Sequence, residues 1–279
     1  MSTRNANLKN KTGQGRKVTP TRILFDEPGP KGRRNILIVS AVFVVLLALA
    51  IAGGWYQLWW NYQLEPDKWL PFLQPDLLRF FGRGALGTIT ATLVAAVFTF
   101  PLALLLALGR LSKNRVVSLT VGGWVEVFRS LPLLLLVYAF LLAAPRYGLN
   151  LPTFWVLVVP MIISCSATTA EVFRAGIQAV PRGQTEAALS LGMSSNQVSW
   201  LVVIPQALRL VAPNLLTQLV SLLKDSTLGF VVSYADLMHQ GQLYSAQSNS
   251  YIQTYALIAV IYVAINIALT QLANRWRAA

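Results

Sequence analysis

The side chains of this chain that could do chemistry are charged groups set inside long apolar runs. Lys224 and Asp225 are adjacent in the run "SLLKDSTLGFVV", and Ser226 and Thr227 follow them directly. A charged side chain inside a bilayer is costly, so such residues pair with each other, line a cavity or bind a polar solute. One interpretation is a purely structural pair. The pattern favours the other, in which Lys224, Asp225, Ser226 and Thr227 line a pathway for a polar solute.

A second pattern is the tetrapeptide Glu-Val-Phe-Arg, which occurs twice. It runs from Glu126 to Arg129 and again from Glu171 to Arg174. Within each copy the acid and the base are three residues apart, which places them on one helix face where they can pair. These pairs, or cross-pairs between the copies, could fix helix packing. Alternatively, Glu171 and Arg129 line or gate the inner end of a pathway.

Several kinds of catalytic centre are excluded. No G-x-x-x-x-G-K-[ST] sequence is present, so this chain has no phosphate-binding loop of that type and does not hydrolyse ATP by that route. The only cysteine, Cys165, rules out a disulfide framework, and the only histidine, His239, has no nucleophile and acid near it in sequence. "GRGALG" at 82–87 matches G-x-G-x-x-G but opens an apolar run, so we interpret it as small residues for close helix packing. The sequence predicts no enzyme, no metal and no cofactor on this chain.

The elements that must position these residues are membrane helices. Of 279 residues, 55% are hydrophobic and 12% are charged, which is too apolar a composition for a soluble domain. A helix needs about 20 apolar residues to cross a bilayer. We therefore expect an all-α integral membrane protein with six transmembrane helices, at about 36–58, 85–108, 121–143, 154–173, 211–234 and 252–273.

The positive charge is unevenly distributed along these spans. The formal net charge is +13, and most of the 23 Lys and Arg residues fall on the side of the N-terminal tail. This is the positive-inside pattern, so both termini are expected in the cytoplasm and a nucleic-acid function is excluded. The basic tail, 1–35, is expected to be disordered or to lie on anionic lipid. We expect an additional N-terminal helix at 36–60 and a core domain at 84–277.

Between the fourth and fifth expected spans lies a stretch that is too polar to cross a membrane, at about 181–205. Pro181 suits a first helical turn, and Gly192 suits a helix end. Ser194 and Gln197 form a capping-box pattern for a second short helix, which Pro205 is expected to limit. Two short helices at the cytoplasmic surface could dock into a groove of a partner protein or rest on lipid.

The order of residues in this stretch carries a resemblance. Glu186, Ala187 and Ala188, then Gly192, then "VVIP" at 202–205 resemble the E-A-A-x3-G-x9-I-x-L-P signature of bacterial ABC-importer permeases. "VEVFRSLPLLL", "IPQALRLVAPNL" and "LLKDSTLGFVVSYADL" look like the permeases of the polar amino acid uptake family, which serves histidine, glutamate, glutamine and arginine systems. The similarity covers about 84–275. Many members have five spans, and the family usually has Lys-Asp-Thr-Ser-Leu where this chain has Lys-Asp-Ser-Thr-Leu.

The resemblance implies a type I ABC importer permease with a cytoplasmic coupling helix. Glu186, Ala187, Ala188 and Gly192 would then insert into a dimer of ATP-binding subunits, which would carry the ATP and Mg²⁺. A second permease, identical or related, would complete the pathway, and an extracytoplasmic solute-binding protein would deliver the cargo. The cargo would be a polar L-amino acid, with glutamate or glutamine favoured, and the location the bacterial cell membrane.

Two rival functions remain open at this stage. An ion-driven secondary amino acid carrier could use Lys224 and Asp225, although such carriers typically have repeated halves and need no docking helix. A membrane scaffold without transport activity would have no need of charge in the middle of the membrane. The resemblance favours the importer.

Overall fold

The computed structural model describes residues 29–278 and divides into two units, one ending at Leu64 and the other beginning at Glu65. In the first unit the main element is α1 (Pro30–Trp60), a single helix whose apolar side chains are exposed. Its length and composition suit a membrane span. Residues 1–28 of the predicted basic tail lie outside the described residues.

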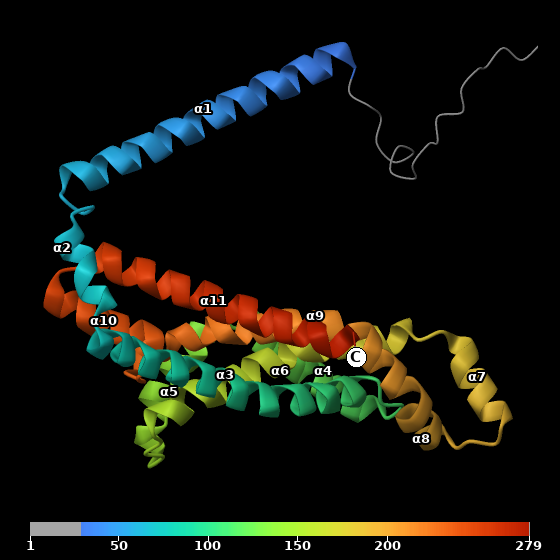
Figure 1. The fold of residues 1–279 in the computed structure, drawn as a ribbon. Helices are drawn as coiled ribbons and strands as arrows, with labels where there is room; N and C mark the ends of the chain where they lie inside the picture. The colour runs from blue at the N-terminus through green and yellow to red at the C-terminus, as the bar shows by residue number, and fades with distance from the viewer. Residues whose placement is uncertain (1–28, 279) are drawn as a thin grey trace, which may run out of the picture. The chain divides into compact units, whose positions relative to one another are not determined.

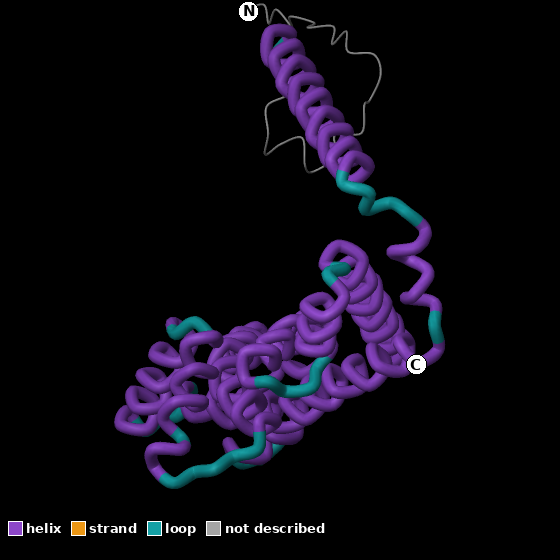
Figure 2. The backbone as a smooth tube through the Cα atoms, turned by 90° about the vertical axis from the view of Figure 1, so that its left-hand side faces the viewer, coloured by secondary structure: helices purple, strands orange, loops and turns teal. Residues whose placement is uncertain are grey.

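The second unit is built from helices and short connections, and Figure 2 shows no strand in the part of the chain that is described. The predicted all-α membrane fold is therefore confirmed. In chain order the elements are α2 (Pro66–Trp69), η2 (Leu70–Leu73), α3 (Pro75–Arg110), α4 (Arg115–Ser130), α5 (Leu133–Ala143), η3 (Pro145–Tyr147), α6 (Thr153–Ala179), α7 (Arg182–Ser190), α8 (Ser195–Gln197), η4 (Val198–Val203), α9 (Ile204–Asp225), η5 (Ser226–Val232), α10 (Leu237–Ser248) and α11 (Tyr251–Ala278).

Five of the described helical segments are long and apolar enough to cross a membrane, and α4 and α5 make a sixth if this bent pair is counted as one span. That span was expected as one run at 121–143. Instead, α4 and α5 meet at 97°, because Pro132 confines Leu131 to an extended conformation with φ −84° and ψ 129°. Pro101 and Pro160 lie inside α3 and α6 without ending them, as is tolerated in membrane helices.

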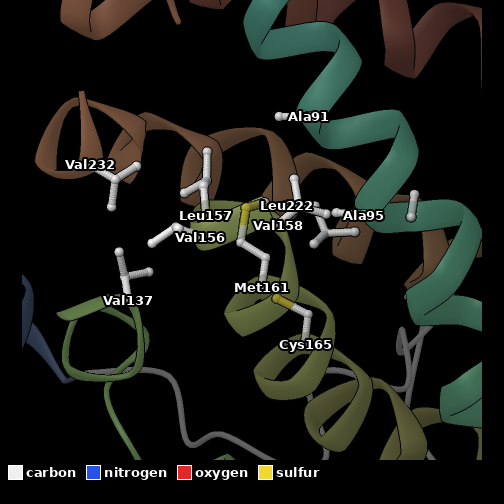
Figure 3. Packing of buried hydrophobic residues seen from close by; sticks show 11 residues of the cluster. Ala91, Ala95, Val137, Val156, Leu157, Val158, Met161, Cys165, Leu222 and Val232 are labelled. Atoms are coloured by element: carbon white, nitrogen blue, oxygen red, sulfur yellow. The ribbon is translucent and has the colours of Figure 1, made fainter. Parts of the chain in front are cut away.

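The core of the second unit lies where α6 packs against α3, α5 and α9. Ala91 and Ala95 of α3 are fully buried and allow the helices to approach closely. Around Leu157 and Met161 of α6, side chains of α3, α5 and α9 converge (Figure 3). Helix packing in lipid depends on such close contact, since apolar side chains gain little by leaving an apolar solvent.

The two ends of this unit carry different elements. In Figure 1 the long helices α3, α6 and α11 run in roughly the same direction, and α7 and α10 lie at opposite ends of them. The segment from Ser195 to Val232 is one long, largely apolar helical run that begins near α7. It therefore links the end that carries α7 to the interior.

Candidate functional site

Lys224 and Asp225 lie at the end of α9, where the α-helix gives way to the 3₁₀ turns of η5. The Lys224 side chain is exposed at the surface of this chain, whereas Asp225 is partly buried. The Cys165 thiol of α6 donates to Asp225 Oδ2 at 3.5 Å. The two adjacent charges therefore face different surroundings, and Cys165 contacts one of them.

The hydroxyls that follow are bonded to the backbone of their own helix. Ser226 Oγ donates to the Leu223 carbonyl at 2.8 Å, and Thr227 Oγ1 donates to the Lys224 carbonyl at 2.6 Å. Ser226 is fully buried. In this conformation both hydroxyls satisfy carbonyl groups at the end of α9, which lack partners within a regular α-helix.

The two Glu-Val-Phe-Arg copies form their internal ion pairs. Arg129 Nη2 lies 2.9 Å from Glu126 Oε1, and Arg174 Nη2 lies 2.8 Å from Glu171 Oε2. No cross-pair between the copies occurs among the described residues. Instead, Glu171 also pairs with Arg110 at the end of α3. Sequence reasoning missed Arg110, because 61 residues separate it from its partner and only the packing of α3 on α6 brings them together.

The coupling stretch begins with α7, whose C-terminal end has a well-defined cap. Gly192 has φ +80°, its N–H donates to the Leu189 carbonyl at 2.9 Å, and the Met193 N–H donates to the Ala188 carbonyl at 3.2 Å. This pattern is a Schellman motif, which a residue in the left-handed conformation completes. Glycine takes that conformation at little cost.

The coupling residues lie on different faces of α7. Ala188 is buried, while Glu186 and Ala187 are exposed on the part of the helix that this chain leaves uncovered. Gln206 Nε2 of α9 donates to Gln184 Oε1 at 3.2 Å, so α7 is tied to the start of α9. The exposed face therefore belongs to a helix that a hydrogen bond ties to α9.

The second short helix does not end where the sequence predicted. The capping box forms: Gln197 N–H donates to Ser194 Oγ at 3.4 Å, and the Ser194 N–H donates to Gln197 Oε1 at 2.8 Å. Pro205, however, does not limit the helix, which continues into α9. The π-helical turn η4 precedes Pro205 and changes the hydrogen-bond register there, so the missing proline N–H is accommodated.

A further polar residue, Asp236, lies between η5 and α10. Its side chain is fully buried, Oδ1 accepts from the His239 N–H at 2.7 Å, and Oδ2 has no donor among the described residues. Burial raises the pKa of this carboxyl from 3.8 to about 7. Its position before α10 is an N-cap signature, the one sequence signal that could have drawn attention to it.

The backbone around Asp236 is docked tightly on α3. The Leu237 N–H donates to Thr88 Oγ1 at 3.1 Å, and Tyr234 Oη donates to the Gly87 carbonyl at 3.1 Å. A Cβ at Gly84 or Gly87 would collide with this segment. Gly84 and Gly87 of "GRGALG" therefore serve close packing, whereas a Cβ at Gly82 would meet nothing within 4 Å. His239 is partly buried on α10.

The described residues include no group of three His, Cys, Asp or Glu side chains that could hold a metal ion.

Comparison with known proteins gives consistent matches. The family model described as "Binding-protein-dependent transport system inner membrane component" matches residues 99–277. The chain is 32% identical to the glutamate transport system permease protein GluD of Corynebacterium glutamicum, over 77% of this chain and 80% of that protein. It is 33% identical to the probable glutamine ABC transporter permease protein GlnP of Bacillus subtilis, over 71% and 92% respectively.

Solved structures agree with the sequence matches. A crystal structure of an amino acid ABC transporter with histidines superposes with a TM-score of 0.69 and 31% sequence identity. The match covers 75% of this chain and 96% of the other. The described core therefore corresponds to nearly the whole of that subunit.

Proposed function

The chain belongs to the family of inner membrane components of binding-protein-dependent transport systems, and on that premise we propose that it forms part of the membrane pathway of an ATP-driven importer for a polar L-amino acid. The predicted ABC-importer resemblance and the type I permease fold are confirmed by the family match and the solved structure. Glutamate or glutamine is the cargo we propose, because the relatives named above are glutamate and glutamine permeases.

The observation that carries this proposal is the construction of α7. Its exposed residues, Glu186 and Ala187, lie on a short helix with a left-handed cap at Gly192 and a backing contact at Ala188. A helix of this size fits a groove in a partner protein. We propose that the partner is a dimer of ATP-binding subunits, which holds the ATP and Mg²⁺.

A movement of α7 would then be transmitted into the membrane through the chain and the contacts that connect α7 to α9. The bond between Gln184 and Gln206 joins α7 to α9, and α9 ends at Lys224 and Asp225. Displacement of α7 by the ATP-binding subunits would move the start of a long helical run whose other end carries the charges. A two-state pathway needs such a rigid connection between its partner and its gate.

For the cargo, we propose contact with Lys224 and Asp225. Lys224 is exposed on a span, and an ammonium there is stable only toward a polar cavity or another protein chain, not toward lipid. In the proposed pathway it would face the carboxylate of the amino acid, with Asp225 able to accept from the ammonium. Ser226 and Thr227 would contribute through the local backbone that their hydroxyls stabilise, and Glu171 and Arg129 would lie at the inner end.

The remaining partners complete the proposed importer. A second permease, identical or related, would supply the other wall of the pathway, and an extracytoplasmic solute-binding protein would deliver the cargo. We propose that both termini lie in the cytoplasm, which the charge distribution supports. The protein would then be a multi-pass component of the bacterial cell membrane.

Reconstitution tests this function. Proteoliposomes that contain the chain, its ATP-binding partner and a solute-binding protein should accumulate labelled glutamate or glutamine only when ATP is present. Removal of the ATP-binding subunits should abolish uptake. Uptake by the chain alone, driven by an ion gradient, would instead establish a secondary carrier and overturn the proposal.

A further inference from the structure

A polar cavity of about 580 Å³ lies between the end of α3, the first half of α4 and the end of α6. It lies apart from Lys224 and Asp225, which do not line it. Side chains and backbone of these three helices form its wall, and the residues that matter below are Arg110, Ser118, Gly122, Gly123, Arg174 and Gln178. The end of α6 is also the end that leads into α7.

The cavity carries an excess of positive charge. Arg110 and Arg174 share the single carboxylate of Glu171. Glu126, the other acid at the cavity, is paired with Arg129 at 2.9 and 3.0 Å. Three guanidinium groups therefore pair with two carboxylates, and one positive charge is left over at Glu171.

Arg110 has unused hydrogen-bond donors. A guanidinium has five N–H donors, and within the described part of the chain Arg110 engages only Nη1, on Glu171. Arg174, by contrast, uses Nε on Glu171 at 2.9 Å and Nη1 on Gln178 at 2.8 Å. Arg110 is therefore the group best placed to bind an added anion.

The space beside Arg110 is left open by glycine. A Cβ built at Gly122 would meet nothing nearer than Arg110 Nε, at 3.9 Å, and one at Gly123 would meet nothing within 4 Å. Any larger residue at Gly122 would extend toward the guanidinium. Two more cations are close in sequence: Lys113 lies in the turn that leads from α3 into α4, and Arg115 opens α4. Neither has an ion-pair partner among the described residues.

An apolar surface adjoins this cationic cavity. Leu119 borders the cavity and is largely exposed, and α4 also exposes Val116 and Val127. Basic cavities between membrane helices, next to lipid-facing apolar surface, suit a phosphate headgroup with its acyl chains. A soluble anion would use only the cationic part.

We propose that this cavity binds the phosphate of an anionic phospholipid from the adjacent leaflet, with Arg110 as the principal donor and the acyl chains on the exposed face of α4. The occupant would brace α3, α4 and α6 next to the segment that leads into α7. This lipid site lies apart from Lys224 and Asp225 but adjoins Glu171 and Arg129, which we propose for the inner end of the pathway. Its readouts are lipid retention and unfolding, so they do not depend on which amino acid is imported.

The test uses the purified full-length chain in nanodiscs of phosphatidylcholine, with and without phosphatidylglycerol. Retained lipid is measured by native mass spectrometry, and thermal unfolding is measured in parallel. We expect selective retention of phosphatidylglycerol and a higher unfolding temperature in its presence. Removal of one cation with Arg110→Gln should weaken retention about fivefold.

Two further variants keep the outcome interpretable if Arg110→Gln disturbs folding. Gly122→Leu fills the cavity and preserves every charge, so it should also abolish selective retention. Arg79→Gln removes an exposed arginine of α3 whose pair with Asp76 is long, at 3.4 Å, and should leave retention unchanged.

Three results would overturn the proposal. Equal retention of the two lipids would show that the cavity does not select an anionic headgroup. Unchanged selectivity in Gly122→Leu would show that the lipid binds elsewhere. Inorganic phosphate in phosphatidylcholine nanodiscs provides the third arm. If it reproduces the full stabilisation, the cavity takes a free anion and not a lipid.

Discussion

At the scale of single residues, Lys224 and Asp225 have different surroundings although they are adjacent. Successive residues of a helix point about 100° apart, so one can be exposed while the other packs inward. Lys224 is exposed, and Asp225 accepts a hydrogen bond from Cys165. Loss of the lysine therefore removes a charge from the proposed pathway without emptying a packed position.

We expect Lys224→Gln to lower the initial rate of ATP-driven uptake about tenfold or more, because one charged hydrogen-bond partner of the cargo is lost. Insertion and thermal unfolding should change little. Labelled uptake by the reconstituted importer checks this, with Lys31→Gln in α1 as the matched control. Normal uptake kinetics in Lys224→Gln would count against the pathway assignment.

Asp236 is the residue whose burial most affects how the stability of the folded chain depends on pH. Because its native pKa is raised from 3.8 to about 7, the native state holds a proton in that range that the unfolded state has released. Stability should therefore fall as pH rises through this window. The reason is the cost of a buried carboxylate with one oxygen that has no donor among the described residues.

We expect the unfolding temperature of the wild-type chain to decrease between about pH 4 and about pH 7 and to level off above that, and Asp236→Asn to remove most of that decrease. Asparagine is also a good N-cap, so α10 should keep its start. Thermal unfolding across the pH series measures the effect. If Asp236→Asn keeps the full pH dependence of the wild-type unfolding temperature, another group binds the proton that is released on unfolding.

At the scale of elements, proline and glycine act according to their surroundings. Pro132 ends a helix, because Leu131 before it is extended, whereas Pro213 lies inside α9 without ending it. Gly192 is used for its positive φ, whereas Gly176 of α6 is used for space against Val211 of α9. The residue type alone does not decide between these uses.

A glycine series in α7 tests the role of its cap. We expect Gly192→Val to lower ATP-coupled uptake severalfold while ATP hydrolysis persists, since a left-handed conformation costs a non-glycine residue about 1–2 kcal/mol. Gly192→Asn should be tolerated better, because asparagine adopts that conformation more readily. Uptake and ATP hydrolysis are measured on the same reconstituted sample.

The control lies in the same helix. Gly183 has ordinary φ and no neighbour within 4 Å of a built Cβ, so Gly183→Ala should keep uptake and raise helix stability by up to about 1 kcal/mol. If Gly192→Val and Gly183→Ala behave alike, the left-handed cap has no role in coupling.

Local patterns in the sequence predicted several of these features. The capping box at Ser194 and Gln197, the end of α7 at Gly192 and the spacing of Glu171 and Arg174 depend on residues within a turn of each other. The pairing of Arg110 with Glu171 and the burial of Asp236 depend on contacts between distant helices. Sequence periodicity carries no record of such contacts, so neither could be predicted.

At the scale of the whole molecule, the buried core belongs to the second unit. The apolar window of α1 has no buried residue, whereas that of α6 is 67% buried. The matching family model begins at residue 99, and the amino acid transporter structure is covered almost completely by 75% of this chain. The family match therefore lies wholly after α1.

We therefore expect a chain that lacks residues 1–60 to fold and to support ATP-driven uptake within about twofold of the full chain, because the family match at residues 99–277 lies wholly after the deleted segment. A longer deletion, of residues 1–74, also removes Phe72, which is buried against Phe81 with ring centroids 6.4 Å apart. That deletion should cost about 3 kcal/mol or more. Thermal unfolding and uptake of both chains provide the comparison. If the shorter deletion inserts and unfolds normally but loses uptake, α1 takes part in transport or assembly and is more than an added anchor.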